Sequence, residues 1–99
     1  MASNRKLSGV LKGRSVAGIH AVPAGRGVVV GFDDGSQLTV KTAGDAPLPA
    51  VTGRVRAVRQ SGTTLCLDLE PVATLQLKTL EPTASVMVRD ARGVLEYAD

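Results

Sequence analysis

Two stretches of this chain, residues 25–40 and residues 54–67, follow nearly the same pattern of side chains. In each stretch, apolar residues recur at every second position, a turn containing glycine follows, and a second alternating run comes after the turn. Val30 and Leu38 correspond in this way to Ala57 and Leu65. The pattern predicts two β-hairpins in an antiparallel sheet, and it says little about chemistry.

Short strands also account for the rest of the chain. Residues 16–22 read as a strand before the first hairpin, and residues 85–88 and 94–97 read as a last hairpin. A further strand carries Leu75 and Leu77 on one face. The predicted class is therefore all-β.

The prolines and glycines indicate where this β structure begins and ends. The five prolines lie between the predicted strands, where a sheet tolerates them, and residues 43–52 read as a connecting loop. Residues 1–15 are basic and weakly patterned, which is typical of a mobile terminus. We expect a basic, flexible N-terminal arm over residues 1–15 and a single β domain over residues 16–99.

Residues 48–58 also allow a helix. Leu48, Val51, Val55 and Val58 recur at helical spacing. Against the helix stand Gly53 in its interior, at a cost of about 1 kcal/mol, and the similarity of this segment to the first hairpin. A strand is the first interpretation, and the helix is the alternative.

The two faces of each hairpin predict its register, because a one-residue slip would turn the apolar side chains to solvent. In the first hairpin, a three-residue loop over residues 33–35 pairs Val30 with Leu38. Gly35 then takes the left-handed conformation that closes such loops.

In the second hairpin, a three-residue loop over residues 61–63 keeps apolar side chains on one face and opposite charges on the other. The expected partners are Val55 with Leu69, Ala57 with Leu67, Val58 with Cys66, Arg54 with Glu70 and Arg56 with Asp68. In the last hairpin, a four-residue loop over residues 90–93 would pair Val88 with Leu95 and Val86 with Tyr97, closing the domain.

Composition bounds the class of protein. The chain has no apolar run of about eighteen residues and its first residues lack the apolar core of a signal peptide, so we expect a cytoplasmic protein without membrane contact. The single cysteine, Cys66, can form no internal disulfide. Phe32 and Tyr97 are the only aromatic residues. A core of small aliphatic side chains favours completion by a second copy of the chain.

The sequence contains no convincing motif for catalysis, metal or cofactor. His20, the only histidine, would need to meet Ser36 and Asp33 or Asp34 to form a nucleophilic triad, and the spacing does not require this. One histidine and one cysteine do not complete a zinc site, and the two aspartates lack the rest of a calcium loop. The glycines of residues 25–31 precede a strand rather than a helix, which argues against dinucleotide binding. We expect no enzyme, no cofactor and no metal.

Basic residues give the clearest functional signal. Lysine and arginine outnumber the acidic residues by 12 to 9, for a net charge of +3. A basic arm beside a small β domain could follow a phosphate backbone with little sequence preference. Two observations weaken this reading, because Arg54 and Arg56 have predicted carboxylate partners and the chain lacks a stacking platform for single strands. The candidate nucleic-acid-binding residues are Arg5, Lys6, Lys12, Arg14, Arg26, Arg59 and Arg92.

A succession of antiparallel hairpins in 99 residues resembles the SH3-like class of small barrels or rolls. The resemblance implies a binding module rather than an enzyme. The first functional hypothesis is therefore a non-catalytic interaction module that binds a protein partner or itself. The alternative is a nucleic-acid-binding protein that uses the basic arm and surface arginines.

Overall fold

The computed structural model describes residues 2–22, 27–42, 52–70, 73–81 and 85–99. In these ranges the chain forms nine strands and one helix, α1 (Arg5–Leu11). The strands are β1 (Ala2–Ser3), β2 (Ser15–Ala21), β3 (Gly27–Phe32), β4 (Gln37–Lys41), β5 (Gly53–Ser61), β6 (Thr64–Glu70), β7 (Ala73–Lys78), β8 (Val86–Arg89) and β9 (Leu95–Ala98). The all-β class predicted from the sequence is confirmed, and residues 53–61 form a strand rather than the alternative helix.

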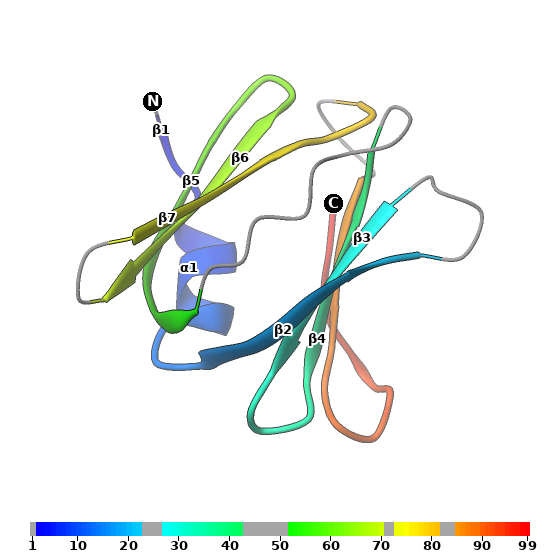
Figure 1. Ribbon diagram of the computed structural model, residues 1–99. Coiled ribbons are helices and arrows are strands. Elements are labelled where there is room, and N and C mark those ends of the chain that lie inside the picture. Colours follow the sequence, from blue (N-terminus) through cyan, green and yellow to red (C-terminus); the bar gives the residue numbers. More distant parts are fainter. Residues whose placement is uncertain (1, 23–26, 43–51, 71–72, 82–84) are drawn as a thin grey trace.

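All strand pairs in the described part of the chain are antiparallel. The strands follow the order β7-β6-β5-β2-β3-β4-β8-β9, with β1 beside β5, and the sheet does not close on itself. β2 joins β5 only where Ser15 and Val16 face Arg54 and Gly53. The sheet divides at this short junction into two layers (Figure 1). One layer contains β5, β6 and β7, and the other contains β2, β3, β4, β8 and β9.

The core lies between these two layers and is filled by alternate residues of the strands. Val30 of β3, Leu38 of β4 and Leu75 of β7 have no exposed surface, whereas their sequence neighbours are half-buried or exposed. Burial of each such Val or Leu side chain is worth roughly 1.5–3 kcal/mol. The apolar spacing seen in the sequence therefore identifies the inner face of the sheet.

The first hairpin has the predicted register. Val28 faces Val40 and Val30 faces Leu38 across β3 and β4. Gly35 closes the loop with a φ of 88°, which is the left-handed conformation expected at this position.

The second hairpin follows the prediction at its open end and departs from it near the turn. Arg54 faces Glu70 and Val55 faces Leu69, but the register then shifts by one residue at Arg56. This β-bulge brings Val58 into the core with no exposed surface, in the place expected for the smaller Ala57. The larger side chain gains more by burial, which explains the shift.

The bulge changes every partner nearer the turn. Ser61 faces Thr64, so the loop consists of Gly62 and Thr63 alone, and the predicted three-residue loop is wrong. Gly62 has a positive φ of 55° in this loop. The expected pairs of Ala57 with Leu67, Arg56 with Asp68 and Cys66 with Val58 are also wrong. The observed pairs are Ala57 with Asp68, Val58 with Leu67 and Arg59 with Cys66.

The last hairpin differs from its prediction for a local reason. Tyr97 faces Val88, and Leu95 faces Arg89, so both expected pairs are wrong. The carboxylate of Asp90 accepts hydrogen bonds from the backbone N–H groups of Arg92 and Val94, at 2.8 and 2.9 Å. The backbone N–H of Asp90 donates to the Val94 carbonyl and that of Gly93 donates to the Asp90 carbonyl, each at 2.9 Å, so the loop consists of residues 91–93 and is one residue shorter than predicted.

The N-terminal residues are part of the folded core. Where a flexible arm was expected, Arg5–Leu11 forms α1, and Leu7 and Leu11 are fully buried among the strands. The side chain of Asn4 caps the helix by accepting a hydrogen bond from the backbone N–H of Leu7 at 3.0 Å. Residues 43–51 of the predicted loop over residues 43–52 lie outside the described residues. In the described part of the chain, no helix is long and apolar enough to cross a membrane.

Candidate nucleic-acid interface

Arg14, one of the predicted candidates, is held inside the fold. Its two terminal nitrogens donate hydrogen bonds to the two carboxylate oxygens of Glu96, at 3.0 and 2.7 Å, and its Nε lies 3.7 Å from a carboxylate oxygen of Asp34. The hydrogen bond to Glu96 is the main reason that the pKa of Arg14 is raised. Arg14 therefore joins the start of β2 to β9 and the β3–β4 loop.

Arg59 is also committed to a carboxylate. Its Nε and Nη2 atoms donate to the two oxygens of Asp68, each at 2.8 Å, in the bidentate geometry that suits arginine and carboxylate. These hydrogen bonds are the largest cause of the lowered pKa of Asp68, and the nearby charge of Arg56 adds to the effect. The Asp68 side chain is 13% exposed, so the pair lies partly inside the surface of β5 and β6.

The three basic residues of α1 and its C-terminal end are free of such pairs. Arg5, Lys6 and Lys12 are exposed, and none of them is in an ion pair within the described ranges. Leu7 and Leu11 are one turn apart and face the core, so the opposite side of the helix carries the cations. Gly9, which lies between Lys6 and Lys12 in the sequence, is also exposed.

Two hydrogen bonds place α1 alongside β5. The backbone N–H of Asn4 donates to the Val58 carbonyl at 3.0 Å, and that of Gly13 donates to the Val55 carbonyl at 2.9 Å. The helix therefore follows β5 in the opposite direction, and its Lys12 end lies next to the segment that carries Arg54 and Arg56.

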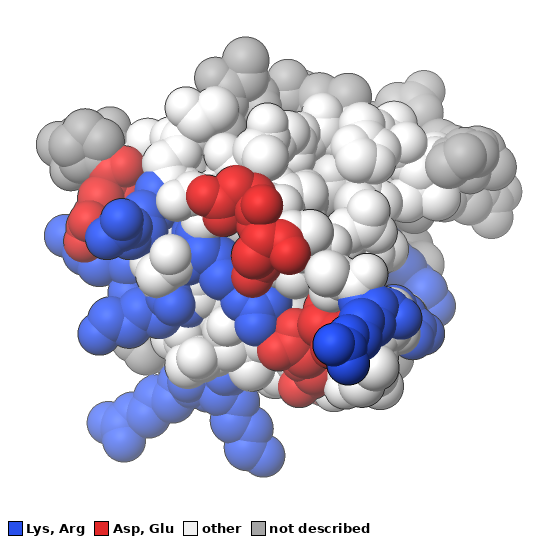
Figure 2. All heavy atoms as spheres, turned by 90° about the horizontal axis from the view of Figure 1, so that it is seen from below, with Lys and Arg blue, Asp and Glu red and all other residues white. Residues whose placement is uncertain are grey.

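Arg54 and Arg56 are exposed and extend this group of cations. Neither is in an ion pair with a described residue, although Glu70 faces Arg54 across the ladder. We define the basic surface as Arg5, Lys6, Lys12, Arg54 and Arg56. Figure 2 shows Lys and Arg side chains spread from the left to the right of the face seen from below, with acidic side chains among them.

Arg54 and Arg56 were not predicted as site residues, because the predicted register paired each of them with a carboxylate. A usable signal was present, since the strand over residues 53–61 holds three arginines and the facing strand only two acids. One arginine therefore had to lack a facing acid, and the bulge leaves Arg56 in that position, while Arg54 faces Glu70 without an ion pair.

The other predicted candidates lie elsewhere. Arg92 is exposed on the β8–β9 loop, outside the basic surface, and Arg26 lies outside the described residues. The structure therefore brings together three of the predicted residues, Arg5, Lys6 and Lys12.

The residues weighed for a nucleophilic triad lie at different ends of β2. His20 is exposed near the far end of β2, five residues or about 16 Å along the strand from Ser15. The backbone N–H of Asp33 donates to the carbonyl of Ser15, so the aspartates predicted for a triad lie at the opposite end from His20. Among the described residues, His, Cys, Asp and Glu form no group suited to a metal ion.

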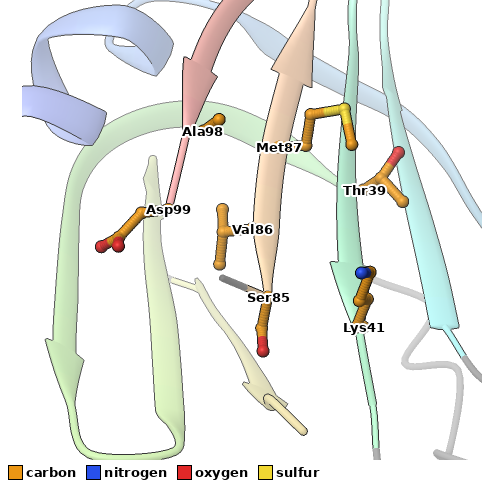
Figure 3. A pocket seen from close by; sticks show the side chains of 7 residues that line it. All are labelled: Thr39, Lys41, Ser85, Val86, Met87, Ala98 and Asp99. Carbon is orange, nitrogen blue, oxygen red and sulfur yellow. The ribbon is translucent and has the colours of Figure 1, made fainter. Parts of the chain in front are cut away.

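A pocket of about 250 Å³ lies on β4, β8 and β9. Thr39, Met87 and Ala98 face one another across these strands, and Figure 3 shows Met87 extending over β4 toward Thr39. The carboxylate of Asp99 points away from them. Lys41, Ser85 and Val86 complete the lining, and the hydroxyl of Ser85 accepts a hydrogen bond from the backbone N–H of Glu81 at 3.0 Å.

The described residues thus form a small all-β protein with an open sheet and a basic surface whose cations are outside the ion pairs of this part of the chain. Comparison of the chain with protein-family models, with curated proteins and with solved structures finds no match.

Proposed function

We propose that the protein is a non-catalytic binding module whose basic surface holds the phosphate backbone of a nucleic acid. The observation that carries the proposal is the contrast between two sets of cations. Arg14 and Arg59 have carboxylate partners at hydrogen-bonding distance, whereas the five residues of the basic surface are exposed and outside the ion pairs of the described chain.

The energetic basis is the release of counterions from nucleic acid. Each phosphate that a lysine or arginine neutralises releases condensed ions, so the binding constant falls steeply as salt rises. A net charge of +3 is modest for the whole chain, but the basic surface groups five positive charges, with Glu70 facing Arg54 and Asp68 near Arg56. Local charge, rather than net charge, is what a phosphate backbone meets.

A matched pair of variants tests the proposal. Lys6→Gln/Lys12→Gln removes two charges from the basic surface, and Lys41→Gln/Lys78→Gln removes two from exposed positions on β4 and β7. The probe is a fluorescent duplex of about 20 base pairs, titrated with protein at about 50 mM salt. We expect the first variant to lose about 10- to 100-fold in affinity, since one phosphate contact is worth roughly tenfold at this salt, and the second to lose less than about threefold.

Equal losses in the two variants would show that affinity follows net charge and not this surface. Absence of binding by the unaltered protein at the same salt would remove the proposal altogether. Thermal melting of each variant confirms that the compared proteins are folded.

A second candidate function is the binding of a protein partner or a second copy. It is favoured by the open sheet and by Val94 and Leu95, which are 57% and 49% exposed at the start of the terminal strand β9. We also propose that the fold is an open roll of the SH3-like class, which would suit the binding of a protein partner or a second copy. Light scattering tests self-association. Binding of a second copy predicts twice the monomer mass for the unaltered protein and the monomer mass for Leu95→Lys.

A further inference from the structure

We infer that the nucleic acid held by the basic surface is a duplex, contacted through its backbone without regard to sequence, rather than a single strand. The inference rests on the function proposed above. It comes from where the chain places its aromatic rings, and from the length and shape of the basic surface.

Neither aromatic ring is available to stack on a base. Phe32 is 4% exposed and lies in the core. Tyr97 is half-buried with its ring packed against the same core, and its hydroxyl accepts a hydrogen bond from Nδ2 of Asn4 at 3.1 Å. These are the only two aromatic residues in the sequence. Single-strand binders draw much of their affinity from stacking bases on such rings, so this surface must rely on charge.

Reliance on charge favours the duplex. A duplex carries one phosphate charge for about every 1.7 Å of its axis, and each neutralised phosphate contributes more to the salt dependence than it does on a single strand. Arg5 and Lys12 are seven residues apart, or about 10 Å along a helix. A duplex carries about six phosphate charges over that length, on its two strands together, and Arg5, Lys6 and Lys12 lie within it.

The exposed side of α1 carries little that could distinguish bases. Gly9 lies between Arg5 and Lys12, and a Cβ atom built on it would have no neighbour within 4 Å. The helix and its C-terminal end therefore present three long cations, Arg5, Lys6 and Lys12, with no side chain at Gly9. Phosphate contacts fix position without reading sequence, which is the mode that this arrangement serves.

The test compares three probes of equal length on the unaltered protein at about 50 mM salt: two duplexes of unrelated sequence, and an oligothymidine that cannot form a duplex. We expect each duplex to bind at least about tenfold more tightly than oligothymidine, because charge alone drives binding. The two duplexes should agree within about threefold, since backbone contacts do not read bases.

Oligothymidine binding as tightly as the duplexes would overturn this inference and leave the proposed function in place. A large preference between the two duplexes would overturn its claim of sequence independence. Failure of all three probes to bind would instead overturn the proposed function, and this inference with it.

Discussion

The carboxylate of Asp68 accepts two hydrogen bonds from Arg59, and this pair makes the stability of the fold depend on acid. The Arg59 hydrogen bonds are the main reason that the pKa of Asp68 in the folded protein lies below its ordinary value of 3.8. The unfolded chain therefore takes up the proton first as pH falls. The stabilisation is complete above about pH 5, decreases below the ordinary pKa, and is lost below the lowered pKa of the folded state.

We predict that Asp68→Asn lowers the urea midpoint at pH 7 and that its difference from the unaltered protein shrinks as the pH falls below 3.8. Urea melts of both proteins across this range check the prediction. A difference that stays constant with pH would mean that the asparagine acts through packing and not through the lost charge.

Among the described glycines, Gly53 is the one at which an added Cβ atom would make the shortest contact. It begins β5 at a φ of 145°, and a Cβ atom there would lie 2.5 Å from the carbonyl oxygen of Glu70. We predict that Gly53→Ala destabilises the fold by at least about 2 kcal/mol, because both the conformation and the close contact oppose the methyl group.

Gly9 supplies the matched control. A Cβ atom at this helical position meets nothing within 4 Å, so Gly9→Ala should stabilise the fold by about 0.5–1 kcal/mol. Urea melts measure both changes. Similar effects of the two substitutions would contradict the close approach of β5 to β6 at Gly53.

At the scale of elements, α1 is part of the core and not an appendage. Leu7 and Leu11 are fully buried, and Asn4 also donates a hydrogen bond to Oε1 of Gln60 on β5 at 3.0 Å. We predict that Leu7→Ala costs about 2–5 kcal/mol, the usual range for a buried leucine. Chemical denaturation of the variant measures this. A cost below about 0.5 kcal/mol would show that the segment is the flexible arm that its composition suggested.

Strands were predictable because alternation is a local signal that repeats in each hairpin. α1 was not, since only Leu7 and Leu11 mark its buried side and the surrounding basic residues and Gly9 conceal it. The bulge at Arg56 was beyond a pattern argument for another reason. It results from competition between Ala57 and Val58 for the core, which only the packed structure decides.

At the scale of the whole molecule, the sequence predicted a group of basic residues but only three of the five that form the basic surface. Charge alone identified Arg5, Lys6 and Lys12 as candidates. It could not separate them from Arg14 and Arg59, whose carboxylate partners depend on strand order and register. The arrangement of the elements divides the cations into those that hold the fold together and those that face solvent.

The salt dependence of duplex binding tests this division most directly. If all five cations of the basic surface contact phosphates, the logarithm of the binding constant should fall against that of salt with a slope of about −4.5. Lys6→Gln/Lys12→Gln should reduce the slope by about 1.8, and Lys41→Gln/Lys78→Gln should leave it unchanged. A slope near zero, or the same slope in the unaltered protein and the Lys6→Gln/Lys12→Gln variant, would contradict the account.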